Sequence, residues 1–378
     1  MNLLLITTMA GNPWGGSEEL WCKLAKEALT NNINVAISYF DWGKTPSKIK
    51  EIENLGVQSY KRKRIAYTPL IKKPLGKLNE KLWGIRDLEK AVLKSKPDHI
   101  IISMGGFCDL EVPLYQKFLK KLNIPFSLIV HSNPENRYFK LFSIQEMNSL
   151  CEKALKVFFV SNRLLEIAKR QTGNYFKNAE IILNPVNISN SDYVDYLGQQ
   201  DVLNMACVGR ISLSVKGQAL LLQVLASTNW KKRNYILNIY GNGPDEDLLK
   251  LLVSKFKLEN KVIFHGHVSD IRTDIWAKNQ LLVMPSYYEG LPLALVEAML
   301  CGRTAVCTDV GGAKEVLNEN NGYFAEAATL TSFTNAMEKM WENKEQLQEQ
   351  GKGARQEVLE YIGAFPKYNE LLNNLLYE

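Results

Sequence analysis

The sequence predicts an α/β protein with two doubly wound domains, each built on a parallel sheet covered by helices. Three observations support this: the chain has 378 residues, short apolar β-rich runs alternate with longer helical patterns, and this alternation occurs twice. Continuous apolar strands separated by helices are typical of parallel sheets buried on both faces. At roughly 150 residues per domain, the length fits two domains.

The expected elements follow the same order in both halves of the chain. In the first half, strands are expected at residues 3–8, 34–39, 100–103, 126–131 and 157–161, with helices at 16–31, 79–95, 110–122 and 145–154. In the second half, strands are expected at 202–208, 235–240, 261–264, 281–285 and 304–308, with helices between them.

Breaks in these patterns predict the domain boundaries. Asn184-Pro185 leads into a polar stretch up to Asp201, which places residues 1–187 in the first domain and 188–364 in the second. Near the end, Gly363 and Pro366 interrupt the helical pattern before a last amphipathic helix at 368–376.

Composition and charge limit the function classes. The chain is 46% hydrophobic and 23% charged, which is ordinary for a globular protein. It has no membrane-length apolar run and no basic segment before its first strand, and its six dispersed cysteines are expected to be reduced thiols. These features predict a cytoplasmic protein. Residues 1–190 carry 28 Lys/Arg and 17 Asp/Glu (+11), whereas residues 191–378 carry 18 and 23 (−5), so the first half is expected to face an anionic partner.

Residues 60–83 are rich in Lys and Arg interleaved with Tyr, Leu, Ile and Trp. Two prolines prevent one continuous helix there. The segment is either a solvated loop or a contact with an acceptor or an anionic membrane surface.

The segment from Met284 to Met299 carries the most chemistry. A buried strand ends at Pro285, a loop contains Glu289 and Gly290, and a helix begins near Leu291 and Pro292. Free amides at such a helix start can bind phosphate or a sugar hydroxyl. Glu289 precedes the helix and Glu297 lies inside it, so the two carboxylates are expected to bind different parts of one elongated ligand.

In each predicted domain, the loop that follows the first strand also carries candidate residues. Val208-Gly209-Arg210 with Lys216 follows the first strand of the second domain, and the two cations could stabilise a leaving diphosphate without a metal. Gly15-Gly16-Ser17 follows the first strand of the chain, where a phosphate-approach loop is expected, although it is neither GxGxxG nor a Walker loop.

Two other ligand classes find little support in the sequence. Asp245-Glu246-Asp247 matches a DxD pattern but lies at a helix start, where acids complement the dipole, so no metal site is expected. No helix-turn-helix or aromatic-basic recognition motif supports nucleic-acid binding.

Taken together, these segments resemble the retaining, nucleotide-sugar-dependent glycosyltransferases of family four (glycosyl transferases group 1), which have the GT-B architecture. The matching segments are residues 15–18, VGR…KG (208–217), YGNGP (240–244), FHGHV (264–268), PSYYEGLPLALVEAM (285–299) and GG-x-x-E (311–315). The match is strong across 200–325 and looser across 20–180.

The resemblance implies two domains facing across a cleft, with the acceptor on the first and the donor on the second. The last helix, in residues 365–378, would return to complete the first domain. The implied catalytic residues are His131, Glu289, Arg210 and Lys216. The implied donor-binding residues are Gly15, Gly16, Arg210, Lys216, Tyr240, Gly241, His267, Val268, Glu289, Gly290, Leu291, Pro292, Leu293 and Glu297.

Within that set, Arg210 and Lys216 would bind the diphosphate, Glu289 the sugar and Glu297 the ribose. His131 ends a predicted strand, and the resemblance favours a hydrogen bond to the donor sugar over a role as strong base. In a retaining front-face reaction, the leaving phosphate can take the acceptor proton.

The sequence therefore predicts transfer of a hexose from a nucleotide diphosphate sugar, with UDP-sugars favoured, to an acceptor hydroxyl. The acceptor would be a glycan or lipid-linked glycan, and neither a metal nor an organic cofactor is expected. The alternatives are a sugar-nucleotide epimerase of the same architecture and a non-catalytic module that binds a polyanion or membrane.

Overall fold

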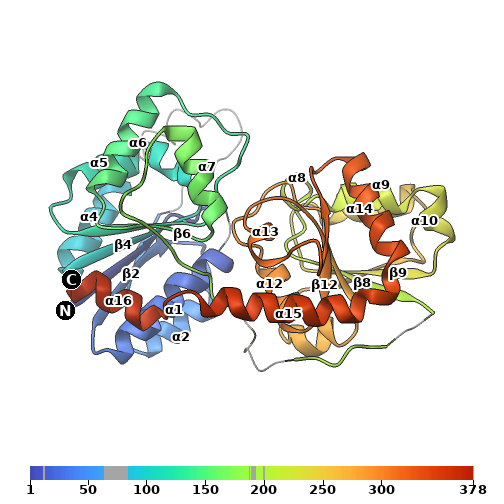
Figure 1. Cartoon of the computed structure of the whole chain (residues 1–378). Helices are drawn as coiled ribbons and strands as arrows, with labels where there is room; N and C mark the ends of the chain where they lie inside the picture. The colour runs from blue at the N-terminus through green and yellow to red at the C-terminus, as the bar shows by residue number, and fades with distance from the viewer. Residues whose placement is uncertain (12, 64–83, 187, 189–192, 199–200, 378) are drawn as a thin grey trace. The chain divides into compact units, whose positions relative to one another are not determined.

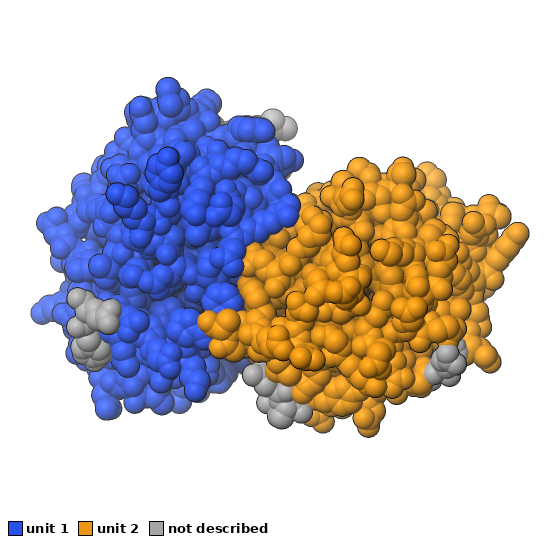
Figure 2. All heavy atoms as spheres, in the orientation of Figure 1, with its two compact units in different colours: residues 1–185, 365–378 blue, residues 186–364 orange. Residues whose placement is uncertain are grey.

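The chain forms two compact α/β units. The computed structural model describes residues 1–11, 13–63, 84–186, 188, 193–198 and 201–377. Unit 1 comprises residues 1–185 and 365–378, and unit 2 comprises residues 186–364 (Figures 1 and 2).

Unit 1 is built on a seven-stranded parallel sheet in the order β3-β2-β1-β4-β5-β6-β7. Its strands are β1 (Asn2–Thr7), β2 (Asn34–Phe40), β3 (Gln58–Arg62), β4 (His99–Met104), β5 (Phe126–Val130), β6 (Val157–Phe159) and β7 (Ala179–Ile181). The central strands are apolar on both faces because helices cover both sides of the sheet.

The helices of unit 1 bury apolar side chains in the core of this unit. They are α1 (Gly16–Thr30), α2 (Ser47–Asn54), α4 (Ile85–Ser95), α5 (Pro113–Lys121), α6 (Leu141–Lys153), α7 (Asn162–Thr172) and α16 (Tyr368–Tyr377). The last helix, α16, packs against α1 (Figure 1). Its Leu371, Leu372 and Leu375 are buried, and the hydroxyl of Tyr368 donates to the Leu183 carbonyl at 2.7 Å. The C-terminal residues therefore complete unit 1.

Unit 2 contains a six-stranded parallel sheet in the order β10-β9-β8-β11-β12-β13. Its strands are β8 (Leu203–Val208), β9 (Tyr235–Tyr240), β10 (Val262–Gly266), β11 (Leu281–Met284), β12 (Thr304–Thr308) and β13 (Tyr323–Ala325). Its helices are α8 (Leu213–Lys216), α9 (Gln218–Leu225), α10 (Thr228–Lys232), α11 (Glu246–Lys255), α12 (Leu293–Leu300), α13 (Ala313–Val316), α14 (Leu330–Glu342) and α15 (Leu347–Gly363).

The expectation of two parallel-sheet domains is confirmed, but three strands were not expected from the sequence. Strands β7 and β13 have only three residues each, which is too short for a recognisable pattern. Strand β3 lies at the edge of the sheet, and its polar sequence QSYKR lacks the apolar run that predicts a strand. Its last three residues fall in the basic segment 60–83. The rest of that segment, residues 64–83, lies outside the described residues.

Two further observations concern cysteines and membrane spans. All six cysteines are free, and only Cys108 is not buried. Within the described part of the chain, none of the helices combines the length and apolarity needed to cross a bilayer.

Candidate functional site

The site residues expected in unit 2 gather at one edge of its sheet. Arg210 follows β8, Gly241 follows β9, His267 follows β10 and Glu289 follows β11. These four strands are neighbours in the order β10-β9-β8-β11, and all run parallel. Their carboxyl ends therefore meet along one edge, which is where open α/β sheets bind ligands.

An ion pair at this edge joins two of the expected residues. The ammonium of Lys216 lies 2.6 Å from Oε1 of Glu289, although 73 positions separate them in the sequence. The hydroxyl of Ser286 donates to the same oxygen at 2.7 Å. A cation suited to phosphate and a carboxylate suited to sugar hydroxyls thus lie side by side.

Backbone contacts fix the loops that carry this pair. The amide of Tyr287 donates to the Val215 carbonyl at 2.8 Å. Gly217, with φ of +63°, lies so close to the same loop that a Cβ there would be 2.0 Å from the Pro285 carbonyl oxygen. From the other side, the hydroxyl of Thr308 donates to the Ser286 carbonyl at 2.5 Å. The loops after β8 and β11 and the end of β12 are therefore held against one another.

A second set of close contacts joins the loops after β8, β9 and β10. The amide of Gly241 donates to the Gly266 carbonyl at 2.7 Å, and the amide of Ile211 donates to the Asn242 carbonyl at 3.0 Å. Gly241 has φ of +124°, and a Cβ there would lie 2.1 Å from the Gly209 carbonyl oxygen. Only glycine combines this dihedral angle with this approach.

The acidic residues of the DxD pattern, Asp245-Glu246-Asp247, lie in the same region, and two of them have partners within the protein. Oδ2 of Asp245 accepts a hydrogen bond from the amide of Leu213 at 2.8 Å, at the start of α8. Glu246 pairs with Lys250 one turn further along α11. Among the residues that the structure describes, no cluster of three His, Cys, Asp or Glu side chains is arranged to hold a metal ion.

Helix α12 begins directly after the Glu289 loop. Leu291 is buried, Pro292 precedes the helix in an extended conformation, and Leu293 is the first helical residue. The amide of Gly312 donates to the Gly290 carbonyl at 2.7 Å, which fixes the loop that enters the helix. Glu297 is buried one turn inside α12, so the two glutamates occupy different levels of this edge, as expected from their spacing.

The remaining unit 2 residues differ in exposure. Arg210 and His267 are exposed and Val268 is half-buried, which leaves them accessible to a ligand. The ring of Tyr240 is buried, stacked on His265 at 4.5 Å between centroids, and its hydroxyl accepts from Asn279 at 3.0 Å. The Tyr240 side chain is therefore packed against His265 and Asn279 at the end of β9.

In unit 1, the glycine loop leads into α1 and a buried carboxyl group. Gly15 caps the helix and Gly16 is its first residue. Glu18, in the first turn of α1, is buried, and its oxygens accept from the hydroxyls of Thr7 and Ser17 at 2.9 and 2.5 Å. Burial raises the pKa of Glu18 above its usual range, although both hydroxyls oppose this shift.

His131 lies at the carboxyl end of β5, as expected. Its Nε2 is 2.9 Å from the hydroxyl of Ser103, which lies in the neighbouring strand β4. Burial lowers the pKa of His131 to about 3, while the side chain of Asn184 opposes this shift. The imidazole is therefore neutral near pH 7, and it suits a hydrogen-bonding role better than that of a base.

Three polar residues at these edges were not among the predicted site residues. Ser286 donates to Glu289, and Glu18 and Asp109 are buried acids at the carboxyl edge of unit 1. Asp109 accepts from the hydroxyl of Thr8 at 2.5 Å, and burial raises the pKa of its carboxyl group. In the sequence, only the position of Ser286 three residues before Glu289 could have indicated that it contacts this carboxylate.

Replacing His131 with Gln is expected to reduce the loss of stability between pH 7 and pH 5. An unfolded His has a pKa of about 6.5, so below that pH the unfolded chain binds a proton that buried His131 does not. The free energy of unfolding therefore decreases by about 1.4 kcal/mol for each pH unit below about 6.5, which amounts to a loss of about 2 kcal/mol at pH 5. Urea unfolding of both proteins at both pH values measures this difference.

Comparing the unaltered protein with His131→Gln cancels the effect of other buried groups on the pH dependence of stability. His99, with its pKa lowered to about 4 by burial, and the raised carboxyl pKa values of Glu18 and Asp109 are common to both proteins. If both proteins lost the same free energy of unfolding on acidification, His131 would not be a buried neutral group.

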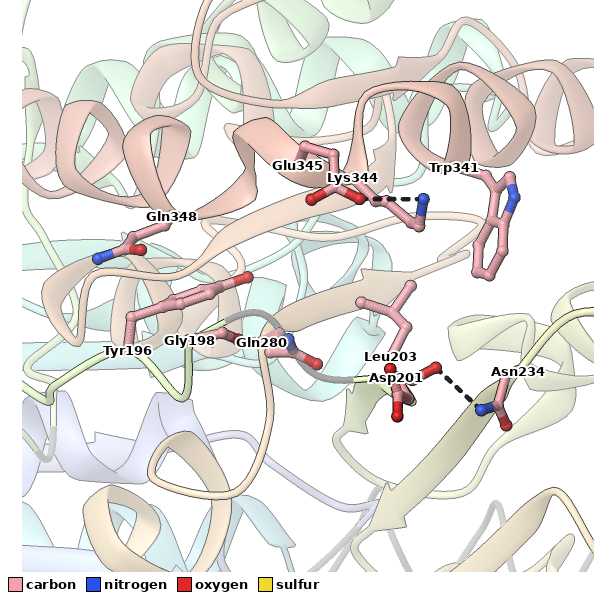
Figure 3. Close-up of a pocket in the computed structure, with 10 residues that line it drawn as sticks. All are labelled: Tyr196, Gly198, Asp201, Leu203, Asn234, Gln280, Trp341, Lys344, Glu345 and Gln348. Atoms are coloured by element: carbon pink, nitrogen blue, oxygen red, sulfur yellow. Dashed lines mark hydrogen bonds and ion pairs between the residues drawn. The ribbon is translucent and has the colours of Figure 1, made fainter.

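A small cavity lies at the opposite edge of the unit 2 sheet (Figure 3). Its volume is about 70 Å³, and its lining includes Leu203 at the start of β8 and Gln280 just before β11. The side-chain amide of Asn234 donates to the Asp201 carbonyl at 2.9 Å, and Lys344 pairs with Glu345 at 3.2 Å. The cavity is too small for a sugar ring, and it lies away from the Lys216–Glu289 edge.

Comparison with known proteins identifies the domain that carries this edge. Residues 199–357 match the family described as glycosyl transferases group 1. The matched residues make up most of unit 2. The ion pair, the glycine turns and helix α12 all lie within the matched residues.

Curated relatives match part of the chain. An N-acetyl-alpha-D-glucosaminyl L-malate synthase of Bacillus anthracis is 30% identical over 33% of this chain and 32% of its own length. A poly(ribitol-phosphate) alpha-N-acetylglucosaminyltransferase of Staphylococcus aureus is 26% identical over 51% of this chain and 43% of its own length. The matches thus span about a third to two fifths of the length of these relatives.

Solved structures match the chain over its whole length. HepE of Anabaena in complex with UDP has a TM-score of 0.72 at 19% identity, covering 100% of this chain and 99% of HepE. Sucrose-phosphate synthase of Thermosynechococcus elongatus has a TM-score of 0.74 at 16% identity, covering 99% and 98%. The chain therefore has the GT-B fold.

Proposed function

We propose that the protein transfers a hexose from a nucleotide diphosphate sugar to an acceptor hydroxyl, with retained anomeric configuration. The observation that carries this proposal is the Lys216–Glu289 pair at the carboxyl edge of a group 1 glycosyl transferase domain. A diphosphate needs cations and a sugar needs hydrogen-bond acceptors, and this edge offers both within 2.6 Å.

The roles of the other residues follow from their positions. Arg210 is exposed at the end of β8, where its planar guanidinium can reach the diphosphate. Glu297, deeper in α12, would accept hydrogen bonds from the ribose, and the backbone of residues 290–293 would contact donor oxygens. The base would lie near His267, Val268 and the turn at Gly241. Gly15, Gly16 and His131 of unit 1 would contribute to the phosphates and the donor sugar.

In this mechanism, the acceptor oxygen attacks the anomeric carbon as the bond from that carbon to the diphosphate breaks. The leaving phosphate oxygen takes the acceptor proton on the same face, so no strong protein base is required. Lys216 and Arg210 would stabilise the charge that develops on the diphosphate. With two cations in this role, the reaction is expected to proceed in a metal chelator.

The donor and acceptor classes rest on charge and on similar proteins. HepE was solved with UDP, and the Staphylococcus aureus relative is named for transfer to poly(ribitol-phosphate), which supports a UDP-sugar and a surface glycan here. The basic first half of the chain suits an anionic or lipid-linked acceptor. Peripheral membrane contact through residues 60–83 remains a prediction, since residues 64–83 lie outside the described residues.

A donor and acceptor panel tests this function. Purified protein is incubated with each nucleotide sugar, with and without glycan acceptors, and the products are analysed by mass spectrometry and by NMR of the new linkage. An α-linked product from an α-configured donor supports retention. Conversion of the donor sugar without any acceptor would instead identify an epimerase, and binding without turnover would identify a non-catalytic module.

Replacing Lys216 with Met is expected to weaken UDP binding by roughly 10- to 100-fold, because a charge-assisted bond to phosphate is lost while the side chain keeps its length. Isothermal titration calorimetry with UDP measures this change. Lys250→Met is the matched control, since Lys250 also pairs with a glutamate at 2.7 Å but lies on α11. Equal UDP affinity of the two variants would argue against the role of Lys216.

A further inference from the structure

The tripeptide Tyr-Phe-Lys occurs twice in unit 1, and both copies have the same arrangement. The first copy is Tyr138, Phe139 and Lys140, and the second is Tyr175, Phe176 and Lys177. Tyr138 is 89% exposed and Tyr175 is 84% exposed, whereas both phenylalanines are buried. Both lysines are exposed. In each copy, the buried ring anchors a loop that presents an aromatic and a cationic side chain to solvent.

The two loops are attached to the same part of the core. Phe139 and Phe176 each contact Phe107, with ring centroids 6.0 Å apart in both pairs. The side chain of Gln171, at the end of α7, donates to the carbonyls of Pro134 and Arg137 at 2.9 and 2.8 Å. The segment that leads to Tyr175 is therefore bound to the segment that leads to Tyr138.

The first loop continues into two more exposed apolar residues. Leu141 is 73% exposed and Phe142 is 72% exposed in the first turn of α6, whose buried side consists of Met147, Leu150 and Cys151. Single exposed apolar side chains are normal on soluble proteins. Here two large apolar side chains lie on loops that share an anchor, and two more lie in the helical turn that follows the first loop. Their grouping with exposed lysines is not explained by packing.

We infer that these residues, here called the Tyr-Lys surface (Tyr138, Lys140, Leu141, Phe142, Tyr175 and Lys177), dock on an anionic lipid bilayer. Tyrosine favours the boundary between headgroups and acyl chains, Leu and Phe favour the acyl region, and Lys pairs with lipid phosphates. The net charge of +11 on residues 1–190 complements such a bilayer.

The Tyr-Lys surface is connected to His131 by a short loop. The loop of residues 131–140 begins with His131 at the carboxyl end of β5 and ends in the first Tyr-Phe-Lys copy. A bilayer bound there would bring a lipid-linked acceptor to the sheet edge that carries His131. This last point rests on the proposed function, whereas bilayer docking itself does not.

Vesicle co-sedimentation of the full chain tests the inference. We expect binding to vesicles of phosphatidylcholine mixed with phosphatidylglycerol, and weaker binding to phosphatidylcholine alone or at high salt. Tyr138→Ser with Tyr175→Ser is expected to lower the bound-to-free ratio more than tenfold. Lys140→Gln with Lys177→Gln is expected to lower it about fivefold per lysine.

Leu93→Ser is the matched control, because Leu93 is 74% exposed on α4 and lies outside the Tyr-Lys surface. It should bind vesicles as the unaltered protein does, and thermal unfolding should show that all variants remain folded. In addition, the fluorescence of Tyr175→Trp should shift to the blue with anionic vesicles and be reduced by quenchers placed in the lipid tails.

Two results would overturn the inference. One is no binding of the unaltered protein to anionic vesicles at low salt, and the other is equal binding of the tyrosine variant and Leu93→Ser. Transfer to a water-soluble acceptor, measured in parallel, separates this inference from the proposed function. Turnover without vesicle binding would leave the transferase intact and remove only the docking surface.

Discussion

Replacing Glu289 with Gln is expected to lower kcat for glycosyl transfer by about 100- to 1,000-fold. Oε1 of Glu289 accepts from Lys216 at 2.6 Å and from Ser286 at 2.7 Å, so the carboxylate is held in one orientation. Gln keeps the size and removes the charge that would interact with the donor sugar as positive charge develops on it. Initial rates at saturating donor and acceptor measure the effect.

The matched control for this substitution is Glu349→Gln. Glu349 pairs with Lys352 at 3.0 Å on α15 and is highly exposed, so its loss should change the rate little. Because Lys216 loses its partner in Glu289→Gln, the melting temperature must be measured beside the rate. A folded Glu289→Gln protein with nearly unchanged kcat would refute the assigned role.

Replacing Gly241 with Ala is expected to destabilise unit 2 by about 3 kcal/mol and to abolish measurable UDP binding. A Cβ at this position would lie 2.1 Å from the Gly209 carbonyl oxygen, so the loops after β8 and β9 would have to separate. That movement would displace Arg210, which directly follows Gly209. Urea unfolding and calorimetry with UDP measure the two effects.

Gly56→Ala separates the cost of the dihedral angle from the cost of the collision. Gly56 also has a positive φ, +101°, but a Cβ there meets no atom within 4 Å. It should lose only about 1 kcal/mol and leave UDP binding unchanged. If both alanine variants were equally stable and bound UDP equally well, the close approach of the two loops would not position the site.

The order and kind of the main elements follow from the sequence because apolar runs and helical periodicity are local signals. Strand β9 was expected at 235–240 and occurs as Tyr235–Tyr240, and strand β12 was expected at 304–308 and occurs as Thr304–Thr308. The polar edge strand β3 and the three-residue strands β7 and β13 carry no such signal. Their pairing depends on neighbours that lie elsewhere in the chain.

For the candidate site, the sequence identified residue types but not their partners. It placed Arg210, Lys216 and Glu289 in segments that follow strands and Glu297 inside a helix, and the structure brings the Lys216 ammonium to Glu289. It gave no indication that Ser286 orients this carboxylate or that the Tyr240 ring is buried against His265. These contacts depend on side-chain direction at loops, which periodicity does not encode.

The sequence by itself determined two parallel-sheet domains and the loops at which their chemistry is expected, since these depend on local patterns and short motifs. Only the tertiary structure decided that Lys216 meets Glu289, that Glu18 and Asp109 are buried, and that two Tyr-Phe-Lys loops share one anchor. The physical reason is that strand order and register bring together segments far apart in the chain, and burial then sets their charge and exposure.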